Sequence, residues 1–255
     1  MFPIIPANSA TGTSGNSEGI FGFGWKASAP SYLSLTNLVS NAGVVASDQA
    51  ATTGTARRNL AACEYGGDKG IFGFGQPGPA SPTNLVSNAG VVATDVTGVG
   101  SDRYLPAACS YGEDKGIFGY GLNGGYITVS NLVSNAGVVA SDVAGVGTPR
   151  YAPGACEYGG DKGIFGYGDA GTLTAITNLV SNTGVIGSDV AGVGTPKEGP
   201  AACGYGGDKG IFGFGQNAGG SKVDITHLVS NAGVVASDVT GVGTARDSAA
   251  GCSFN

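Results

Sequence analysis

Short runs of apolar residues, bounded by turn residues, recur along the whole chain with a period of about 47 residues. In the third repeat these runs cover 107–111, 116–120, 129–134 and 138–141. β-Branched and aromatic residues dominate them, and short glycine-containing turns separate the first run from the second and the third from the fourth. None has the 3.6-residue period of an amphipathic helix. Each repeat therefore predicts four short antiparallel strands.

The repeat occurs five times, and the two ends of the array complete each other. Its copies of NLVSN, or HLVSN in the last, begin at Asn37, Asn84, Asn131, Asn178 and His227. The string AACxYG stands between successive repeats, as at 61–66. The first GIFG has no such string before it, whereas the last repeat is followed by an unpartnered copy at 249–254. The first repeat thus lacks the string that the last repeat leaves over, and pairing of these two segments would close a ring.

Four strands in 40 to 50 residues is typical of a β-propeller blade. We therefore expect an all-β, five-bladed β-propeller with four antiparallel strands per blade, as a single domain over 18–255. The segment near Cys252 is expected to pair with the strand at 20–23 and close the ring. Residues 1–17 are expected to form an N-terminal tail or docking segment. Helical repeats are excluded because each of the 49 glycines would cost about 1 kcal/mol inside a helix.

Charge and composition exclude two further classes of function. The net charge is −6 and no basic stripe occurs, so nucleic-acid binding through phosphate neutralisation is not expected. No run of 18 apolar residues occurs, so no membrane insertion is expected. One cysteine per repeat at a constant position predicts small buried hydrophobes near the ring axis, and no disulfides. These cysteines are Cys63, Cys109, Cys156, Cys203 and Cys252.

Neither a cofactor, a metal site nor a catalytic centre is predicted. His227 is the single histidine, and it lies in no cluster with metal-ligand spacing. An aspartate recurs at one position of every repeat, before a Gly-x-Gly turn in the last four, and is expected to accept backbone N–H bonds in the following turn, with calcium coordination as the alternative. These aspartates are Asp48, Asp95, Asp142, Asp189 and Asp238. Almost every acid occupies a repeated position and no nucleophile–base constellation is possible, so the sequence predicts that the protein is not an enzyme.

The connections between the predicted strands form two sets. Those from the first strand to the second and from the third to the fourth are nearly invariant, whereas those from the second to the third and from the fourth to the next repeat vary. Alternate connections of an up-and-down sheet emerge on opposite faces, so the variable ones share a face. Loops on a rigid scaffold commonly carry function, and we predict that this face binds a partner; neutral drift is the alternative. The predicted binding residues are Trp25, Tyr32, Arg58, Arg103, Tyr104, Tyr126, Arg150, Tyr151 and Lys222.

Two resemblances extend these expectations. A short apolar strand, a glycine-bounded turn and an aromatic strand ending in glycine resemble the kelch repeat family of β-propellers, which implies propeller geometry. The kelch glycine doublet closes the second strand, whereas Gly66-Gly67 stands one turn earlier, and Trp25 is the only tryptophan. The strings YGGDKGIFGYG and NLVSNxGVVxSDVxGVGTxR are similar to repeats of tailed-phage and environmental viral proteins, and the opening MFPIIPANSA is similar to the start of some phage tail proteins.

The second resemblance implies a virion structural protein that is a tail, fibre-tip or capsid decoration component. Its N-terminal segment would dock to other virion proteins, while the variable face meets a host-surface glycan or protein. The alternative is a multivalent carbohydrate-binding lectin, in which similar blades offer several weak sugar sites. A lectin should repeat its binding residues, and the aromatic residues of these loops are not repeated.

Overall fold

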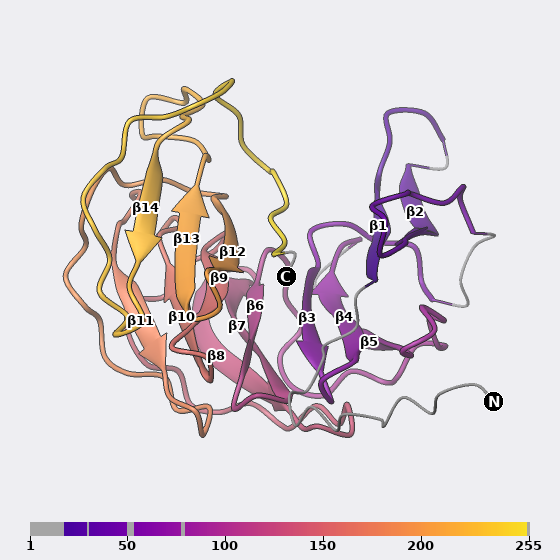
Figure 1. Cartoon of the computed structure of the whole chain (residues 1–255). Coiled ribbons are helices and arrows are strands. Elements are labelled where there is room, and N and C mark those ends of the chain that lie inside the picture. Colours follow the sequence, from indigo (N-terminus) through magenta and orange to yellow (C-terminus); the bar gives the residue numbers. More distant parts are fainter. Residues whose placement is uncertain (1–17, 30, 50–53, 78–79, 254–255) are drawn as a thin grey trace, which may run out of the picture.

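The computed structural model describes residues 18–29, 31–49, 54–77 and 80–253 (Figure 1). These ranges contain no α-helix, and their strands form five antiparallel sheets. The predicted all-β class is therefore confirmed. No helix within them is long and apolar enough to cross a membrane. The predicted N-terminal segment, 1–17, lies outside the described residues.

The five sheets follow one another along the chain, and the GIFG strand is the central strand of every three-stranded sheet. The first sheet pairs β1 (Gly19–Trp25) with β2 (Tyr32–Val39). The second and third sheets contain β3 (Ala61–Tyr65), β4 (Lys69–Gly75) and β5 (Ala80–Val86), then β6 (Ala107–Tyr111), β7 (Lys115–Leu122) and β8 (Tyr126–Val133). The fourth and fifth contain β9 (Gly154–Tyr158), β10 (Lys162–Gly166) and β11 (Thr177–Val180), then β12 (Ala201–Tyr205), β13 (Lys209–Gly213) and β14 (Thr226–Val229).

The predicted last strand of each repeat is present only as isolated bridges to the third strand. In the second repeat Val92 bridges Val86, and Val96 bridges Thr83. Between these bridges the side chain of Asn84 donates a hydrogen bond to the carbonyl of Ala93 at 3.1 Å. A side chain thus takes the place of a backbone ladder bond, and the chain bends away from regular pairing.

The first strands β3, β6, β9 and β12 lie side by side in chain order (Figure 1). The C-terminal segment continues this row, because a Cβ on Gly251 would come within 3.0 Å of the carbonyl oxygen of Ala202 in β12. However, residues 249–253 form no strand, and among the described residues β1 pairs only with β2. A cavity of about 290 Å³ has Ile20, Leu38 and Cys252 among its lining residues.

Neighbouring sheets pack through a repeated aromatic pair. Phe74 in β4 lies at a bulge, with a φ of 65° that places its backbone in the left-handed region. Its ring meets Phe118 of β7 edge-on, with the centroids 5.2 Å apart. Phe118 also covers Gly73, where a Cβ would lie only 2.8 Å from the ring, so the glycine is required. The same pairing joins Phe23 to Phe72, Tyr120 to Phe165, and Tyr167 to Phe212.

Candidate functional site

The invariant and variable connections lie at opposite ends of the sheets. At the invariant end, Asn88 Nδ2 donates to Asp68 Oδ2 at 3.1 Å and so links the two conserved turns of one repeat. The following three repeats keep this contact at 3.0 Å. At the other end lie the residues that we call the variable surface: Trp25, Tyr32, Arg58, Tyr104, Tyr126, Tyr151 and Lys222.

One part of the variable surface combines two aromatic rings with a cation. Trp25 pairs with Tyr32 where β1 and β2 meet the loop. The guanidinium of Arg58 lies 5.5 Å from the Trp25 ring centroid and 5.7 Å from that of Tyr32. Its Nε donates to Gln76 Oε1 at 3.2 Å, which holds the side chain in place. Trp25 is 53 % exposed, so an aromatic face next to a positioned cation is open to a partner.

A second part is a stacked tyrosine pair. The rings of Tyr126 and Tyr151 lie 5.7 Å apart between centroids and are inclined by only 13°. The Tyr151 hydroxyl donates to Asp169 Oδ2 at 3.2 Å. Burial, with the charges of Glu198 and Asp169, raises the pKa of Tyr151. The hydroxyl therefore remains a donor at neutral pH, and the stack carries carboxylates at its edge.

Two more predicted residues lie on this surface but differ from those above. Tyr104 is half-buried and pairs through its backbone with Leu122. Lys222 is exposed, and its Nζ lies 2.6 Å from Asp247 Oδ2 and also contacts Gln216. Seven of the nine predicted binding residues thus lie together at one end of the sheets.

Arg103 and Arg150 are the exceptions, and the prediction that they belong to an open binding face is wrong. Both side chains are 0 % exposed. The Arg103 guanidinium lies 3.7 Å from the Phe74 ring centroid of the second sheet, and its Nη2 donates to Asn131 Oδ1 of the third sheet at 2.6 Å. These arginines therefore fill the interface between sheets.

Alignment of the connections on the repeated cysteine, rather than on their loop positions, places one basic residue six positions before each cysteine. These residues are Arg57, Arg103, Arg150, Lys197 and Arg246. Arg58 belongs to the next position, which differs between repeats. The constant spacing is the signal in the sequence that identifies these residues. The prediction placed Arg103 and Arg150 on the binding face with the rest of their variable connections.

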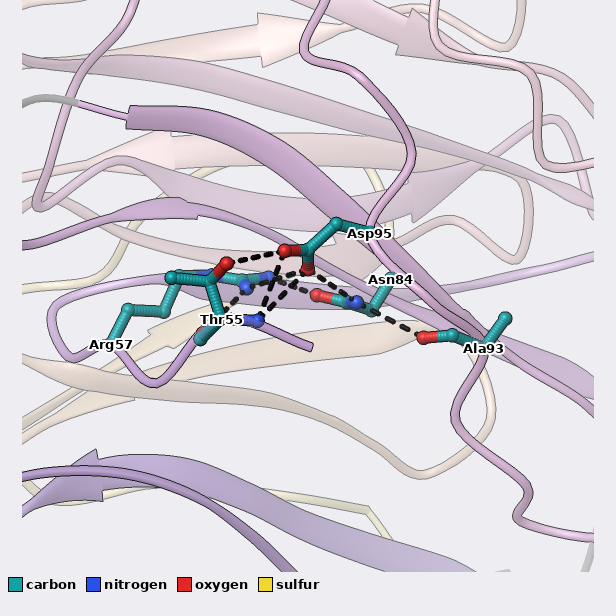
Figure 2. A network of polar contacts seen from close by, with 5 residues as sticks. All are labelled: Thr55, Arg57, Asn84, Ala93 and Asp95. Atoms are coloured by element: carbon teal, nitrogen blue, oxygen red, sulfur yellow. Dashed lines mark hydrogen bonds and ion pairs between the residues drawn. The ribbon is translucent and has the colours of Figure 1, made fainter. Parts of the chain in front are cut away.

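The basic residue is part of a repeated contact between neighbouring sheets, which we call the intersheet clasp (Figure 2). In its first copy, the N–H of Thr55 donates to Asp95 at 3.0 and 3.1 Å, and its hydroxyl donates at 2.5 Å. Arg57 Nη2 donates to Asn84 Oδ1 at 2.5 Å, while the guanidinium lies 4.3 Å from the Phe23 ring centroid. Asn84 Nδ2 in turn donates to Asp95 Oδ1 at 2.8 Å.

The clasp explains the recurring aspartates. Each was expected to accept backbone N–H bonds within its own turn, and Asp95 does accept a backbone N–H, but from Thr55 of the preceding repeat. Burial alone would raise the pKa of Asp95, but the hydrogen bonds from Thr55 and Asn84 hold it below its usual value. Burial lowers the pKa of Arg57 to about 10, so the guanidinium still carries its charge at neutral pH.

The clasp between the fourth and fifth sheets uses different residues. Lys197 replaces the arginine and His227 replaces the asparagine; Nζ lies 3.1 Å from His227 Nδ1. His227 Nε2 lies 2.5 Å from Asp238 Oδ1. Burial lowers the pKa of Lys197 to about 8, and burial and the Lys197 charge lower the pKa of His227. A hydrogen bond from the Thr195 hydroxyl helps to lower the pKa of Asp238 to about 2.

The cysteines are all free thiols in the structure. The Sγ atom of Cys63 packs against Gly116 of the next sheet, and burial raises the pKa of this thiol to about 12. Within the described ranges, no three His, Cys, Asp or Glu side chains gather closely enough to hold a metal ion.

Comparison with known proteins shows a similarity of fold and no match of sequence. No family model matches this sequence, and no curated protein matches it. Among solved structures, the chain is similar to a "novel fungal alcohol oxidase with catalytic diversity among the AA5 family, in complex with copper", with a TM-score of 0.56 and 12 % identity. The match covers 91 % of this chain but only 64 % of that chain, so this chain spans less than two thirds of its length. At this identity the likeness shows the fold alone.

This comparison overturns the prediction that the protein is not an enzyme. A catalytic protein has the same fold, so neither the all-β class nor the repeat architecture can serve to exclude catalysis. The described residues do not fit a copper centre, because both ring nitrogens of His227, the single histidine, are engaged in a clasp.

Proposed function

We propose that this chain is a recognition protein of a virus particle, a tail, fibre-tip or capsid decoration component, that binds its partner through the variable surface. The observation that carries the proposal is that each connection contains a constant basic residue followed directly by a variable one. The basic residue of the clasp is fixed and buried in the first four copies. The residue directly after it is of four types in the five repeats: Arg58, Tyr104, Tyr151, Glu198 and Asp247.

Repeated clasps that hold different side chains suit the recognition of one partner whose surface does not itself repeat. Each clasp holds its connection by several hydrogen bonds, so the following residue is presented on a fixed backbone (Figure 2). The aromatic and cationic groups Trp25, Tyr126 and Arg58 then form a pre-organised contact area, which lowers the entropy lost on binding. We propose a host-surface protein or glycan as the partner.

The second candidate is a lectin, which the Tyr126–Tyr151 stack favours. An aromatic face with Asp169 at its edge offers a stacking surface and acceptors for sugar hydroxyls. This combination is found at one place only among the described repeats, whereas a multivalent lectin repeats its site. Recognition of one partner by the whole variable surface is therefore preferred.

We further propose that the five sheets close into one five-bladed β-propeller and that the bridged segment is the fourth strand of each blade. The side-by-side order of β3, β6, β9 and β12 and the approach of Gly251 to β12 support a fifth position in that row. The N-terminal segment 1–17 is proposed to dock to other virion proteins.

Two measurements test the proposed function. Mass spectrometry of purified virus particles should detect the chain at a fixed ratio to the other particle proteins, and its absence would refute the virion assignment. Labelled protein should bind intact host cells, and the triple variant Trp25→Ala/Arg58→Ala/Tyr126→Ala should lose that binding. The matched control is Lys69→Ala/Lys115→Ala at the invariant end, which should bind as the wild type does. A glycan array separates a sugar ligand from a protein ligand.

A further inference from the structure

Four of the five sheets are followed by a complete clasp, whereas the fifth sheet carries only its donor half. Thr244 and Arg246 stand where Thr55 and Arg57 stand in the first copy. Arg246 stacks on Phe214 of its own sheet, with 3.7 Å to the ring centroid, as the other basic residues do on theirs. Yet Arg246 is exposed, and its guanidinium donates within the described residues only to the carbonyl of Thr244.

The first sheet carries the matching acceptor half. Asn37 Nδ2 donates to Asp48 Oδ1 at 2.8 Å and to Ala46 O at 3.1 Å, which is the arrangement seen around Asn84. Asn37 is only half-buried and Asp48 is exposed, whereas Asn84, Asn131 and Asn178 are 0 % exposed. Within the described ranges, no basic side chain reaches Asn37 and no Thr or Ser donates to Asp48.

The apolar parts of these two faces are complementary in the same way. Phe21 is 51 % exposed, while its equivalents in the other repeats are at most 6 % exposed and cover a glycine of the preceding sheet. The glycine left uncovered is Gly213. On the fifth sheet, Tyr205 and Leu228 are 37 % and 39 % exposed. Their equivalents cover the turn glycine of the next sheet, whereas a Cβ on Gly43 would meet nothing within 4 Å.

We infer that these two faces bind each other within one chain through a fifth clasp. In it Thr244 donates to Asp48, Arg246 donates to Asn37, and the Phe21 ring packs on Gly213 and Phe214. The two faces are complementary in charge. The Arg246 cation and the N–H and O–H donors of Thr244 face the Asp48 carboxylate and the amide oxygen of Asn37. This contact rests on the closed arrangement proposed above and names the residues that hold it.

The same chain, rather than a second copy, is the partner because its own C-terminal segment already spans the two faces. Gly251 lies against β12, and Cys252 lines the cavity that also contacts Ile20 and Leu38 of the first sheet. Such a tether gives the two faces a high effective concentration, which favours an intramolecular contact over association.

A double-mutant cycle tests the fifth clasp. Thr244→Ala, Asp48→Ala and the double variant are compared by thermal unfolding, with Thr148→Ala and Asp189→Ala as the matched cycle in a complete clasp, where the hydroxyl–carboxylate distance is 2.7 Å. We expect each double variant to lower the Tm by less than the sum of its single variants, because the two residues share one interaction. Additive shifts for Thr244 and Asp48, with coupling in the control cycle, would overturn the inference.

Two measurements on the unaltered protein keep the test decisive if a variant does not fold. Hydrogen exchange over 242–247 should be as slow as over 193–198, because the N–H of Thr244 would donate to a carboxylate as that of Thr195 does. Rapid exchange over 242–247 alone would refute the contact. Native mass spectrometry should show monomers; protection that appears only in head-to-tail oligomers would assign the partner to a second copy. None of these readouts depends on binding to host cells, so the recognition proposal stands or fails separately.

Discussion

The guanidinium of Arg103 lies over the ring of Phe74, 3.7 Å from its centroid, and is fully buried between two sheets. Phe74 can take this position only because its backbone adopts a left-handed φ of 65° at a bulge. The same contact follows each of the other sheets, with Phe23, Tyr120, Tyr167 or Phe214 as the ring. An aromatic residue with a left-handed φ and a cation stacked on its ring therefore follow every sheet, and the cation is buried after the first four sheets.

Removal of this cation should destabilise the protein strongly. Arg103→Ala removes a charged hydrogen bond to Asn131 and a desolvated cation–π contact, so we expect the free energy of unfolding to fall by about 2–4 kcal/mol. Urea unfolding followed by circular dichroism measures this change. Arg58→Ala, at the variable position, should change it by less than about 1 kcal/mol. Similar losses for both variants would contradict the assignment of Arg103 to the scaffold.

Restoring the common clasp in the fourth interface should change the pH dependence of stability. The pKa of Lys197 is lowered to about 8 by burial, so its neutral form is favoured in the folded state. The wild type should therefore gain stability as the pH rises from about 8 towards 10.5, the usual value for lysine. The equivalent clasp arginine, Arg57, has a pKa of about 10 and still carries its charge near pH 8 to 9, so Lys197→Arg/His227→Asn should lose the gain over that part of the range.

The comparison needs Tm values of both proteins from pH 7 to 10.5. The exposed Lys222→Arg variant is the control and should keep the wild-type slope. A double variant with an unchanged slope would show that Lys197 is not buried as described.

Glu157 in β9 gives a pH effect of opposite sign. Burial, and then the charge of Glu64, raise the pKa of this carboxyl. The folded state therefore binds this proton more tightly than the unfolded state, and stability falls as the pH rises from 4.5 through the folded pKa. Glu157→Gln removes the charge and should raise the Tm at pH 7, with no difference from wild type near pH 4. Glu113→Gln in an exposed turn is the control, and a lower Tm for Glu157→Gln at pH 7 would count against this account.

The sequence predicted the three strands of the second to fifth sheets well because their signals are local. The apolar run at 107–111 corresponds to β6, and the run at 116–120 lies within β7. The fourth strand was predicted as regular, but the side chain of Asn84 and its equivalents interrupt the ladder. That interruption depends on a side-chain contact which an apolar pattern does not encode.

The candidate site was predicted in part for a similar reason. Trp25, Tyr126 and Lys222 are exposed, as expected for residues of loops that vary. The clasp was missed because its partners are far apart in sequence: Thr55 and Asp95 are separated by 40 positions and belong to neighbouring repeats. An alignment anchored on the repeated cysteines is needed to place Arg103 and Arg150 with Arg57.

The most direct test of the proposal that the clasps hold the fold while the variable surface binds the partner measures folding and binding on one sample. In the triple variant Trp25→Ala/Arg58→Ala/Tyr126→Ala only exposed or half-buried side chains are removed, so we expect a Tm within a few degrees of the wild type and loss of binding to host cells. Retention of binding with an unchanged Tm would contradict recognition by the variable surface. A large fall in Tm would contradict the claim that the clasps, rather than these residues, hold the sheets together.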